Sequence, residues 1–281
     1  MPDEEVYYPR QASVPSSRLV SSFGLPSTAY SNTEEYNGTS WTSGGDINSP
    51  AGLDSAGGSG SQTAALSASG KSGGPPSYTY PSITNSFEYD GSSWTGGGAV
   101  SNARTVAGSA GTQTASLLFG GQSQSNKTEE YDGSSWTNGG NLPQGINRPG
   151  GTGTQTAAIQ MGGHTDPPAD FNVTNYYDGS SWTAQPGTMN TARNALGSSG
   201  TQTNCVVYGG FTYSYPSANS ASTELWDGTS WTTTTSMATA GPTSQSPSGG
   251  DSSLALAVFG GTTVEEWTGP IVTTRNVTTT S

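Results

Sequence analysis

Thr128–Thr137 reads TEEYDGSSWT, and the chain contains this stretch five times with small changes. The other copies are TEEYNGTSWT (Thr33–Thr42), SFEYDGSSWT (Ser86–Thr95), NYYDGSSWT (Asn175–Thr183) and TELWDGTSWT (Thr223–Thr232). Each copy holds a tyrosine or tryptophan and, five residues later, a tryptophan. The constant register of this aromatic pair indicates a chain built from internal repeats.

The aromatic pairs recur at intervals of 41 to 53 residues when a degenerate sixth copy is included. The first aromatic residues are Tyr36, Tyr89, Tyr131, Tyr177, Trp226 and Trp267. The second are Trp41, Trp94, Trp136, Trp182 and Trp231, and the sixth copy has Val272 there. A period of about 40 to 50 residues is typical of a solenoid, a propeller or an array of domains.

A second motif precedes four of the pairs. It reads GSQTAALSASG (Gly60–Gly70), GTQTASLLFGG (Gly111–Gly121), GTQTAAIQMGG (Gly153–Gly163) and GTQTNCVVYGG (Gly200–Gly210). An apolar run closed by Gly-Gly predicts a buried strand that ends in a turn with positive φ. The aromatic strand follows a variable connector, and its Asp-Gly or Asn-Gly favours a two-residue type I′ turn before a strand beginning at Ser-Ser-Trp-Thr.

A small-residue stretch such as Arg104–Ser109 or Arg193–Ser199 supplies a first strand, so each unit is predicted to hold four short antiparallel strands. No helical period occurs, which excludes helical solenoids. We therefore predict an all-β fold, a six-bladed β-propeller with four-stranded antiparallel blades, in a single domain over residues 1–281. The aromatic pairs are expected to pack between blades. The units are approximately 6–42, 52–95, 102–137, 146–183, 193–232 and 243–277.

The chain ends allow this ring to close. Val6–Val14 can form the first strand of unit one, and Ile271–Val277 can form the fourth strand of unit six. The termini should then meet at one blade boundary, and a strand exchanged across that boundary is equally allowed.

The repeat resembles the kelch family of propellers, in which an apolar strand ends in Gly-Gly and a tyrosine and a tryptophan follow at fixed offsets. Gly120-Gly121 with Tyr131 and Trp136 match that pattern, and Met189–Arg193 matches a Met-x-x-x-Arg element before the first strand. Units one and two lack the double glycine, and unit six lacks the second tryptophan. The wording of the repeats also resembles proteins of marine bacteriophages, which implies a place in a virion.

Composition narrows the classes of partner. The net charge is −12, from 20 acidic and 8 basic residues, so the chain repels nucleic acid and anionic membranes. No apolar run is long enough to span a membrane, and the acidic start MPDEEVYYPR shows no secretory signal. The single cysteine, Cys205, lies in an apolar run and is expected to be a buried thiol.

The connections between the second and third strands vary most, and they should all emerge on one side of the ring. The longer ones, 71–85, 164–172 and 211–222, carry Tyr78, Tyr80, Phe171, Phe211, Tyr213 and Tyr215. Variable loops on a rigid scaffold commonly carry binding residues, so we predict contacts there. The alternative is that these aromatic side chains only cover the rim.

Repeated charges allow two interpretations. Arg104, Arg148 and Arg193 follow their tryptophans by 10, 12 and 11 residues and could form a positive ring at the channel mouth. They could equally be structural, in salt bridges or carbonyl caps. The glutamates before the first aromatic residues are expected to be solvated: Glu35, Glu88, Glu130, Glu224 and Glu266. The Asp-Gly turns need no calcium, and we predict no metal and no cofactor.

Catalysis is not expected. A copper-radical oxidase needs more histidines than the single His164, and a Ser/His/Asp hydrolase would depend on that residue alone. A carboxylate pair for glycoside cleavage stays open. We expect a structural or binding module of a virion, a tail fibre, capsid decoration or receptor-binding piece, that contacts virion proteins, a host receptor or a glycan within a multimeric assembly. A glycan-active enzyme and a cellular kelch-type scaffold, extracellular or cytoplasmic, are the alternatives.

Overall fold

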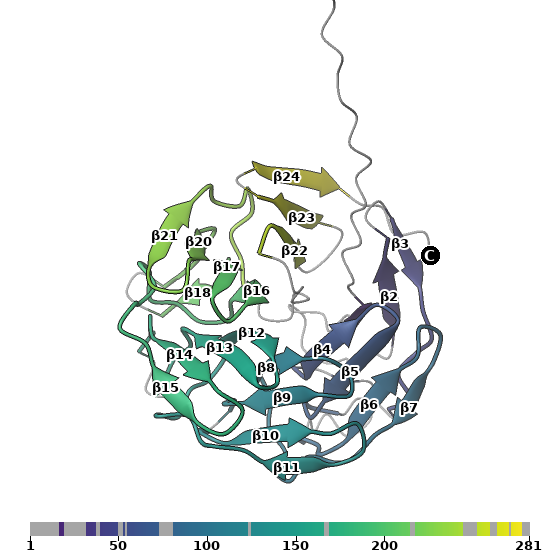
Figure 1. The fold of residues 1–281 in the computed structure, drawn as a ribbon. Coiled ribbons are helices and arrows are strands. Elements are labelled where there is room, and N and C mark those ends of the chain that lie inside the picture. The colour runs from purple at the N-terminus through teal and green to yellow at the C-terminus, as the bar shows by residue number, and fades with distance from the viewer. Residues whose placement is uncertain are drawn as a thin grey trace, which may run out of the picture.

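The computed structural model describes residues 17–19, 32–37, 40–49, 53, 55–72, 81–122, 125–165, 169–213, 217–243, 252–258, 263–269 and 271–276. Its regular elements in these residues are all β-strands. The sheets follow one another around a common centre, with the first strand of each complete sheet innermost (Figure 1). This arrangement of repeated antiparallel sheets is consistent with a β-propeller.

Units two to five each form a four-stranded sheet in which the strands lie side by side in chain order. Unit two holds β4 (Gly57–Ser61), β5 (Ala64–Ala68), β6 (Ser86–Tyr89) and β7 (Trp94–Gly96). Unit three holds β8 (Gly108–Gly111), β9 (Ser116–Phe119), β10 (Thr128–Tyr131) and β11 (Trp136–Asn138). Unit four holds β12 (Gly150–Thr154), β13 (Ala157–Met161), β14 (Thr174–Tyr177) and β15 (Trp182–Ala184). Unit five holds β16 (Gly197–Thr201), β17 (Asn204–Tyr208), β20 (Thr223–Trp226) and β21 (Trp231–Thr234).

Units one and six each contribute three strands to the described residues. Unit one has β1 (Ser17–Leu19), β2 (Thr33–Tyr36) and β3 (Trp41–Ser43). Unit six has β22 (Leu254–Val258), β23 (Thr263–Thr268) and β24 (Ile271–Asn276). The pairing of β24 with β23 confirms the predicted last strand, whereas the first strand predicted at Val6–Val14 lies outside the described residues. Unit five also contains a two-stranded ribbon, β18 (Phe211–Thr212) and β19 (Ala218–Asn219), in the connection between β17 and β20.

The Gly-Gly that closes the apolar strand in units three, four and five adopts the predicted positive φ. Gly120 and Gly121 have φ of 67° and 109°. In unit two a serine takes the first of these positions, with φ of 60° at Ser69. The Ser69 hydroxyl donates to the Arg104 carbonyl (2.7 Å) and accepts from the Arg104 amide (2.7 Å), which stabilises the strained backbone.

Small residues on the first strands allow neighbouring sheets to approach closely near the centre. A Cβ on Gly151 would come within 2.4 Å of the Phe119 ring, so no larger residue fits there. Adjacent first strands are tied by side chains: Thr152 Oγ1 donates to the Gly200 carbonyl (2.9 Å), and Ser198 Oγ donates to that of Gly151 (2.9 Å).

The turn between the third and fourth strands differs from the prediction. Tyr131 pairs directly with Trp136, so the loop has four residues, Asp132–Ser135, and the last strand begins at the tryptophan. Only Gly133 in this loop has positive φ (90°), whereas a type I′ turn needs two such residues. The cause is the Asp132 carboxylate, whose Oδ1 accepts from the amides of Ser134 (2.9 Å) and Ser135 (2.8 Å) and folds the wider loop.

The aromatic pairs lie between neighbouring sheets. Tyr131 and Trp136 of unit three have ring centroids 5.0 Å apart and join one buried cluster with Leu66 and Ala68 of unit two. The equivalent pair of unit four packs against Phe119 of unit three. The boundaries between units are therefore hydrophobic interfaces centred on the repeated aromatic residues.

Polar atoms of the same pairs bond to the preceding unit. In units two to five, the tryptophan of the fourth strand donates its Nε1 to a serine or threonine hydroxyl of the preceding unit. That serine or threonine is the first residue of the third strand. The pairs are Trp94–Thr33 (2.7 Å), Trp136–Ser86 (2.8 Å), Trp182–Thr128 (2.9 Å) and Trp231–Thr174 (2.9 Å).

The tyrosines of the third strands make a second repeated bond. The hydroxyls of Tyr89, Tyr131 and Tyr177 donate to Glu35, Glu88 and Glu130 of the preceding units. Tyr36 of unit one donates to Glu266 of unit six (2.5 Å), so the same contact joins the first and last sheets in the sequence.

Candidate functional site

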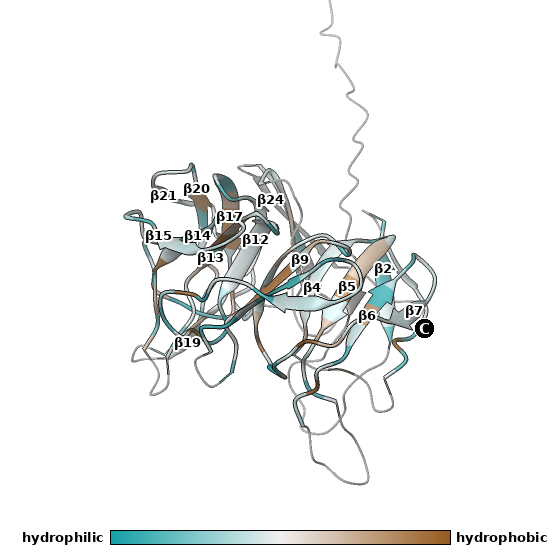
Figure 2. Ribbon diagram, turned by 60° about the horizontal axis from the view of Figure 1, so that its bottom comes forward, coloured by the Kyte–Doolittle hydropathy of each residue, from teal (hydrophilic) through white to brown (hydrophobic). Residues whose placement is uncertain are grey.

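The connections between second and third strands leave every complete sheet at one edge, because each sheet is an antiparallel meander. The two tight turns of each unit lie at the opposite edge. In the turned view β19 lies at the lower edge of the molecule, below β14, β15, β20 and β21 (Figure 2). We call the first the loop edge and the second the turn edge.

The loop edge of units four and five contains a continuous set of backbone contacts. His164 forms a reciprocal pair with Asn147 (2.9 Å for both amide–carbonyl bonds) and bridges to Asp170. In unit five, Phe211 pairs in the same way with Asn194 (2.9 and 2.8 Å). The residue after each Gly-Gly is thus held against the segment that leads into its own sheet.

Asp170 connects the loops of the two units. Its Oδ1 accepts from Asn194 Nδ2 (2.7 Å), and its Oδ2 accepts from the Tyr213 amide (2.6 Å). Asn194 Nδ2 also donates to the Phe211 carbonyl (3.0 Å). The carboxylate therefore fixes the unit-five loop against unit four through bonds to a side chain and to the backbone.

Three rings gather around this carboxylate. His164 and Tyr213 have ring centroids 4.9 Å apart, and Phe211 and Tyr213 have centroids 5.0 Å apart in an edge-to-face arrangement. His164 is buried, whereas the rings of Phe211 and Tyr213 are half-buried. We call His164, Asp170, Asn194, Phe211 and Tyr213 the loop cluster.

The chemistry of the loop cluster favours recognition. Both oxygens of Asp170 already accept hydrogen bonds, so this carboxylate positions the loops. The half-buried rings offer apolar faces for contact or for stacking. The amide of Asn194 is fully buried, and its Oδ1 has no hydrogen-bond partner among the described residues.

The structure places the predicted loop residues as follows. Phe211 and Tyr213 meet in the loop cluster, and Phe171 lies half-buried beside it, with its amide bonded to the Gly163 carbonyl (2.8 Å). Tyr78, Tyr80 and Tyr215 lie outside the described residues. The contact of His164 with Tyr213 was not predicted, because nothing in the spacing of the loops indicated which neighbours would touch.

Two of the three predicted arginines are buried inside their own units. The Arg104 guanidinium pairs with Glu129, and Arg193 Nη2 lies 2.9 Å from Glu224 Oε1. Arg104 is 4% exposed and Arg193 fully buried. Burial lowers the pKa of both guanidinium groups, and the partner carboxylates oppose that shift. These contacts favour the structural interpretation of both arginines.

Arg148 occupies a different position from the other two, so the three do not form a ring of equivalents. Its amide donates to the Val106 carbonyl (3.2 Å), and its carbonyl accepts from the Ala195 amide (3.0 Å), at a φ of 50°. The position equivalent to Arg104 and Arg193 in unit four is Ile146, whose carbonyl accepts from Gly121. Ile146 follows Trp136 by ten residues, as Arg104 follows Trp94, so Arg148 lies two residues beyond the equivalent position.

The expectation of solvated glutamates was wrong. Glu224 is fully buried in its ion pair, and Glu266 is 9% exposed. Glu35, Glu88 and Glu130 accept the tyrosine hydroxyls described above. The tyrosines, in turn, hold these carboxylates against the next sheet.

The Gln of the Gly-Thr-Gln-Thr turn has a function that the sequence did not reveal. Gln155 Nε2 donates to the carbonyls of Ser116 (3.0 Å) and Tyr131 (2.7 Å) in the preceding unit. Gln113 and Gln202 make the same pair of bonds. The same glutamine occurs in three turns of the sequence, and this repetition was the only indication of a structural role.

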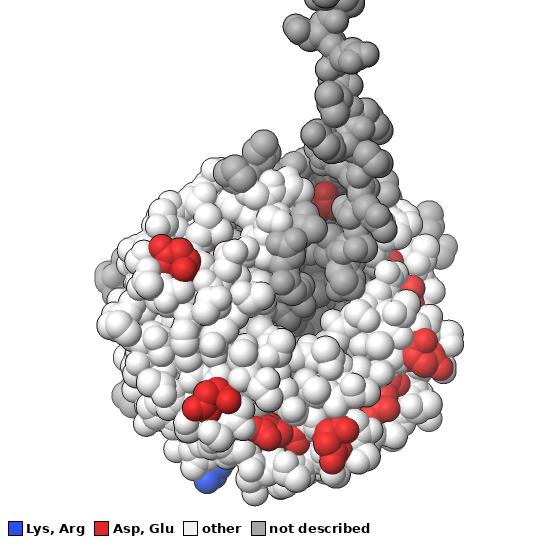
Figure 3. All heavy atoms as spheres, in the orientation of Figure 1, with Lys and Arg blue, Asp and Glu red and all other residues white. Residues whose placement is uncertain are grey.

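The turn edge is regular and acidic. Asp90, Asp132, Asp178 and Asp227 are exposed, and acidic groups recur along the rim of the face shown in Figure 3. Bonds from the serine amides and hydroxyls lower the pKa of Asp90, Asp132 and Asp178 to about 2. Across the described ranges, no group of three or more His, Cys, Asp or Glu side chains could hold a metal ion.

No family model matches the sequence, and comparison with curated proteins gives no significant match. In the part of the chain that the structure describes, no helix has the length and apolar character needed to cross a membrane.

Proposed function

We propose that the chain is a non-enzymatic, kelch-type β-propeller that makes protein or glycan contacts through its loop edge. The loop cluster supports this most directly, because it holds two half-buried aromatic rings of unit five against the buried His164 of unit four on a repeated scaffold. Aromatic residues presented on loops by a rigid frame are common anchors of binding sites.

We also propose that six units close into one ring. The support is the bond from Tyr36 to Glu266, which repeats across the first and last sheets the contact made at three internal boundaries. Ring closure would remove the exposed sheet edges that an open row of sheets presents to other chains.

The proposed setting is a bacteriophage virion, in which the chain would serve as a tail fibre, a capsid decoration or a receptor-binding module. The wording of the repeats supports this setting, and so does an acidic, charge-rich turn edge that discourages contact with nucleic acid. Its partners would be other virion proteins or a host receptor or glycan. Mass spectrometry of purified particles should detect the chain, and its absence from them would exclude a virion component.

Shortening residues 211–222 to the length of the same connection in unit six tests the binding role. We expect unchanged folding by circular dichroism and weaker binding to host cells, glycans or virion partners. The double variant Phe211→Ala, Tyr213→Ala should act in the same direction. Asp132→Asn on the turn edge is the matched control. If the control weakens binding and the loop variants do not, the contacts lie on the turn edge and the proposal is wrong.

A further inference from the structure

The segments that lead into the innermost strands are joined to one another on the loop edge. In four successive pairs of units, an amide donates to the carbonyl of the equivalent residue in the preceding unit. The bonds are Val106 to Ser55 (2.9 Å), Arg148 to Val106 (3.2 Å), Ala195 to Arg148 (3.0 Å) and Thr243 to Ala195 (2.9 Å). We call these five residues the inner belt. Its first four members each stand two residues before an innermost strand, so the belt lies near the centre of the loop edge (Figure 1).

Four members of the inner belt have a strained backbone. Ser55, Val106, Arg148 and Ala195 have φ between 50° and 56°. Glycine adopts this conformation without strain, whereas a β-branched residue such as valine rarely adopts it. No unit from two to five has glycine here, and the side chain differs in every one of them. Each unit therefore retains a side chain that its backbone disfavours, and strain of this kind is typical of functional positions.

The cation of the inner belt, Arg148, lies next to the loop cluster. Arg148 follows Asn147, whose backbone pairs with His164. Its carbonyl accepts from Ala195, which follows Asn194. One residue on either side thus joins Arg148 to a member of the loop cluster, in unit four and in unit five. Because the arginine side chain is long, its guanidinium can meet a ligand that contacts this cluster.

The guanidinium of Arg148 is an unused donor. It makes no ion pair and no hydrogen bond with any residue that the structure describes, and the residue is half-buried. Arg104 and Arg193, by contrast, are in buried ion pairs. Asp170, the carboxylate of the loop cluster, accepts its hydrogen bonds from Asn194 and Tyr213. A half-buried guanidinium without a partner has lost part of its hydration, and a bound anion would replace it.

Much of the negative charge of the chain lies away from this surface. Glu129 and Glu224 are neutralised by their arginines. The four aspartates of the Asp-Gly turns stand on the turn edge, which is opposite: Asp90, Asp132, Asp178 and Asp227. An anion that approaches Arg148 from the loop-edge side therefore meets less repulsion than the net charge of −12 implies.

Two kinds of group thus lie close together, a planar cation and the half-buried rings of Phe211 and Tyr213. A guanidinium binds a carboxylate through two parallel hydrogen bonds. Aromatic rings offer an apolar surface to the C–H face of a sugar. A uronic acid has a carboxylate and such a face on one ring, so one residue can contact both groups. In a peptide these groups belong to separate side chains.

We propose that the inner belt and the loop cluster bind an acidic glycan. Arg148 would hold the carboxylate of a uronic acid, while Phe211 and Tyr213 pack against its ring. This assignment rests on the binding role proposed above for the loop edge and adds the class of ligand.

Trigalacturonic acid is the probe for the test. Its methyl ester, which has the same rings and no charge, is the control at equal ionic strength. We expect saturable binding of one trimer per chain by calorimetry, at about millimolar concentration as suits a small ligand. The ester should bind about tenfold more weakly or worse, because it cannot form the charged hydrogen bonds. Equal binding of acid and ester would overturn the proposal.

Two variants with the same change of charge locate the binding. Arg148→Gln should weaken binding of trigalacturonic acid by about tenfold or more. Lys127→Gln is the matched control, because Lys127 is an exposed cation on the same edge, just before β10. Undiminished binding in Arg148→Gln, or equal weakening in both variants, would overturn the assignment to Arg148.

Arg148→Gly provides a second route if the glutamine variant does not fold. Glycine accepts the φ of 50° without strain, so this variant should fold. Binding of the probe should again be lost. Binding that persists in this variant would contradict the proposal, whatever its Tm.

Triglutamate tests the other source of carboxylates. We expect it to bind more weakly than trigalacturonic acid, because it has no sugar ring to pack on Phe211 and Tyr213. Equal or tighter binding of triglutamate would assign the surface to acidic peptides and overturn the choice of a glycan.

The failure of this assignment differs from a failure of the binding role itself. If shortening residues 211–222 weakens binding to host cells or virion partners but the probe does not bind, the acidic glycan is wrong and the role of the loop edge stands. If shortening leaves binding to those partners unchanged, the role of the loop edge is wrong.

Discussion

At the boundary between units three and four, Trp182 Nε1 donates to Thr128 Oγ1, whereas at the boundary between units five and six Thr223 Oγ1 has no donor among the described residues. The first boundary also has a tyrosine bonded to a glutamate of the preceding unit, Tyr177 to Glu130. The second has Trp267 beside Leu225, and its Nε1 has no partner in the described part of the chain.

The difference shows what holds the repeat in register. The apolar contacts persist at both boundaries, with Trp267 in a buried cluster with Val206 and Tyr208. Of these two boundaries, only the one between units three and four keeps the indole–hydroxyl and tyrosine–glutamate bonds. Apolar burial therefore keeps the units together. The hydrogen bonds of the indole and phenol groups determine how many buried polar groups at each boundary have a partner.

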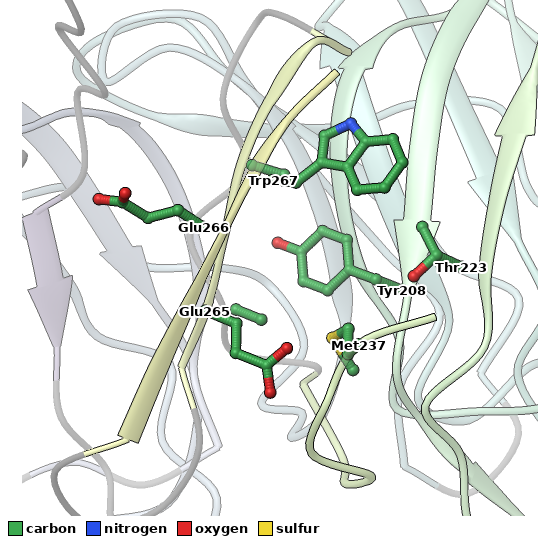
Figure 4. Close-up of a pocket in the computed structure, with 8 residues that line it drawn as sticks. Tyr208, Thr223, Met237, Glu265, Glu266 and Trp267 are labelled. Carbon is green, nitrogen blue, oxygen red and sulfur yellow. The ribbon is translucent and has the colours of Figure 1, made fainter. Parts of the chain in front are cut away.

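The largest expected effect comes from removing an indole at an internal boundary. Trp136→Ala should lower the free energy of unfolding by about 3–5 kcal/mol, because a buried ring and its bond to Ser86 are both lost. Trp267→Ala should cost less, since its Nε1 has no partner among the described residues and one side faces a cavity (Figure 4). Urea unfolding measures both. An equal loss of unfolding free energy in both variants would contradict the expected difference between the two boundaries.

A matched pair of nearly isosteric changes isolates the hydroxyl groups. Thr128→Val should destabilise by about 1–3 kcal/mol, because it leaves the buried Nε1 of Trp182 without an acceptor. Thr223→Val should be neutral or stabilising, because within the described part of the chain its hydroxyl already has no partner. Chemical unfolding of both variants gives the answer, and a similar loss in each would mean that Thr223 has an acceptor role at its boundary.

Alkaline pH should weaken the internal boundaries that have a tyrosine–glutamate bond. Burial, and then the bond to a glutamate, raises the pKa of Tyr89 and of Tyr131 from 10.0 to about 12. Since the folded state favours the protonated phenol, its contribution is complete below pH 10 and is lost as the pH rises through about 12.

Urea midpoints measured from pH 9 to 12, with tyrosinate absorbance, test this loss. Tyr131→Phe should flatten the decline. A substitution of Trp267 by Phe should leave its shape unchanged, since unit six has no phenol at that position. A decline that is the same in all three proteins would show that other groups titrate.

The smallest effect is expected at the turn edge. The amide of Ser135, followed by the hydroxyl and amide of Ser134, lowers the pKa of Asp132 from 3.8 to about 2. The folded state thus favours the charged carboxylate, and its contribution, present above pH 3.8, is lost as the pH falls through about 2. Asp132→Asn should flatten the acid side of the stability profile slightly. A larger loss than that of Thr128→Val would contradict the ranking.

The sequence predicted the elements of each unit because they depend on local chemistry. The apolar strand, its Gly-Gly turn and the aromatic strands are all where the pattern placed them, as Gly120, Gly121, Tyr131 and Trp136 illustrate. The four-residue Asp132–Ser135 loop was missed because Asp-Gly is compatible with two turns. The serine hydroxyls and amides on the aspartate decide between them.

Contacts between units were less predictable, because they depend on register in three dimensions. Arg148 was predicted to match Arg104 and Arg193 from an approximate spacing, but its backbone bonds align it with Val106 and Ala195, two residues further along the chain. Glu224 was predicted to be a surface residue, but it is buried in an ion pair with Arg193. The loop cluster itself joins His164 and Tyr213 from different units, a proximity that no periodicity in the sequence encodes.

The Gln155 bonds show how such a chain can change its length. Gln113, Gln155 and Gln202 each donate to two carbonyls of the preceding unit, Ser116 and Tyr131 for Gln155, so these bonds depend on the path of the backbone and not on a particular side chain. Such a bond can form with any preceding unit whose backbone follows the same path. A duplication or deletion of one internal unit by recombination would therefore preserve these glutamine bonds, whereas a second copy of unit six, with Val272 in place of tryptophan, would supply no indole to the hydroxyl of the unit before it.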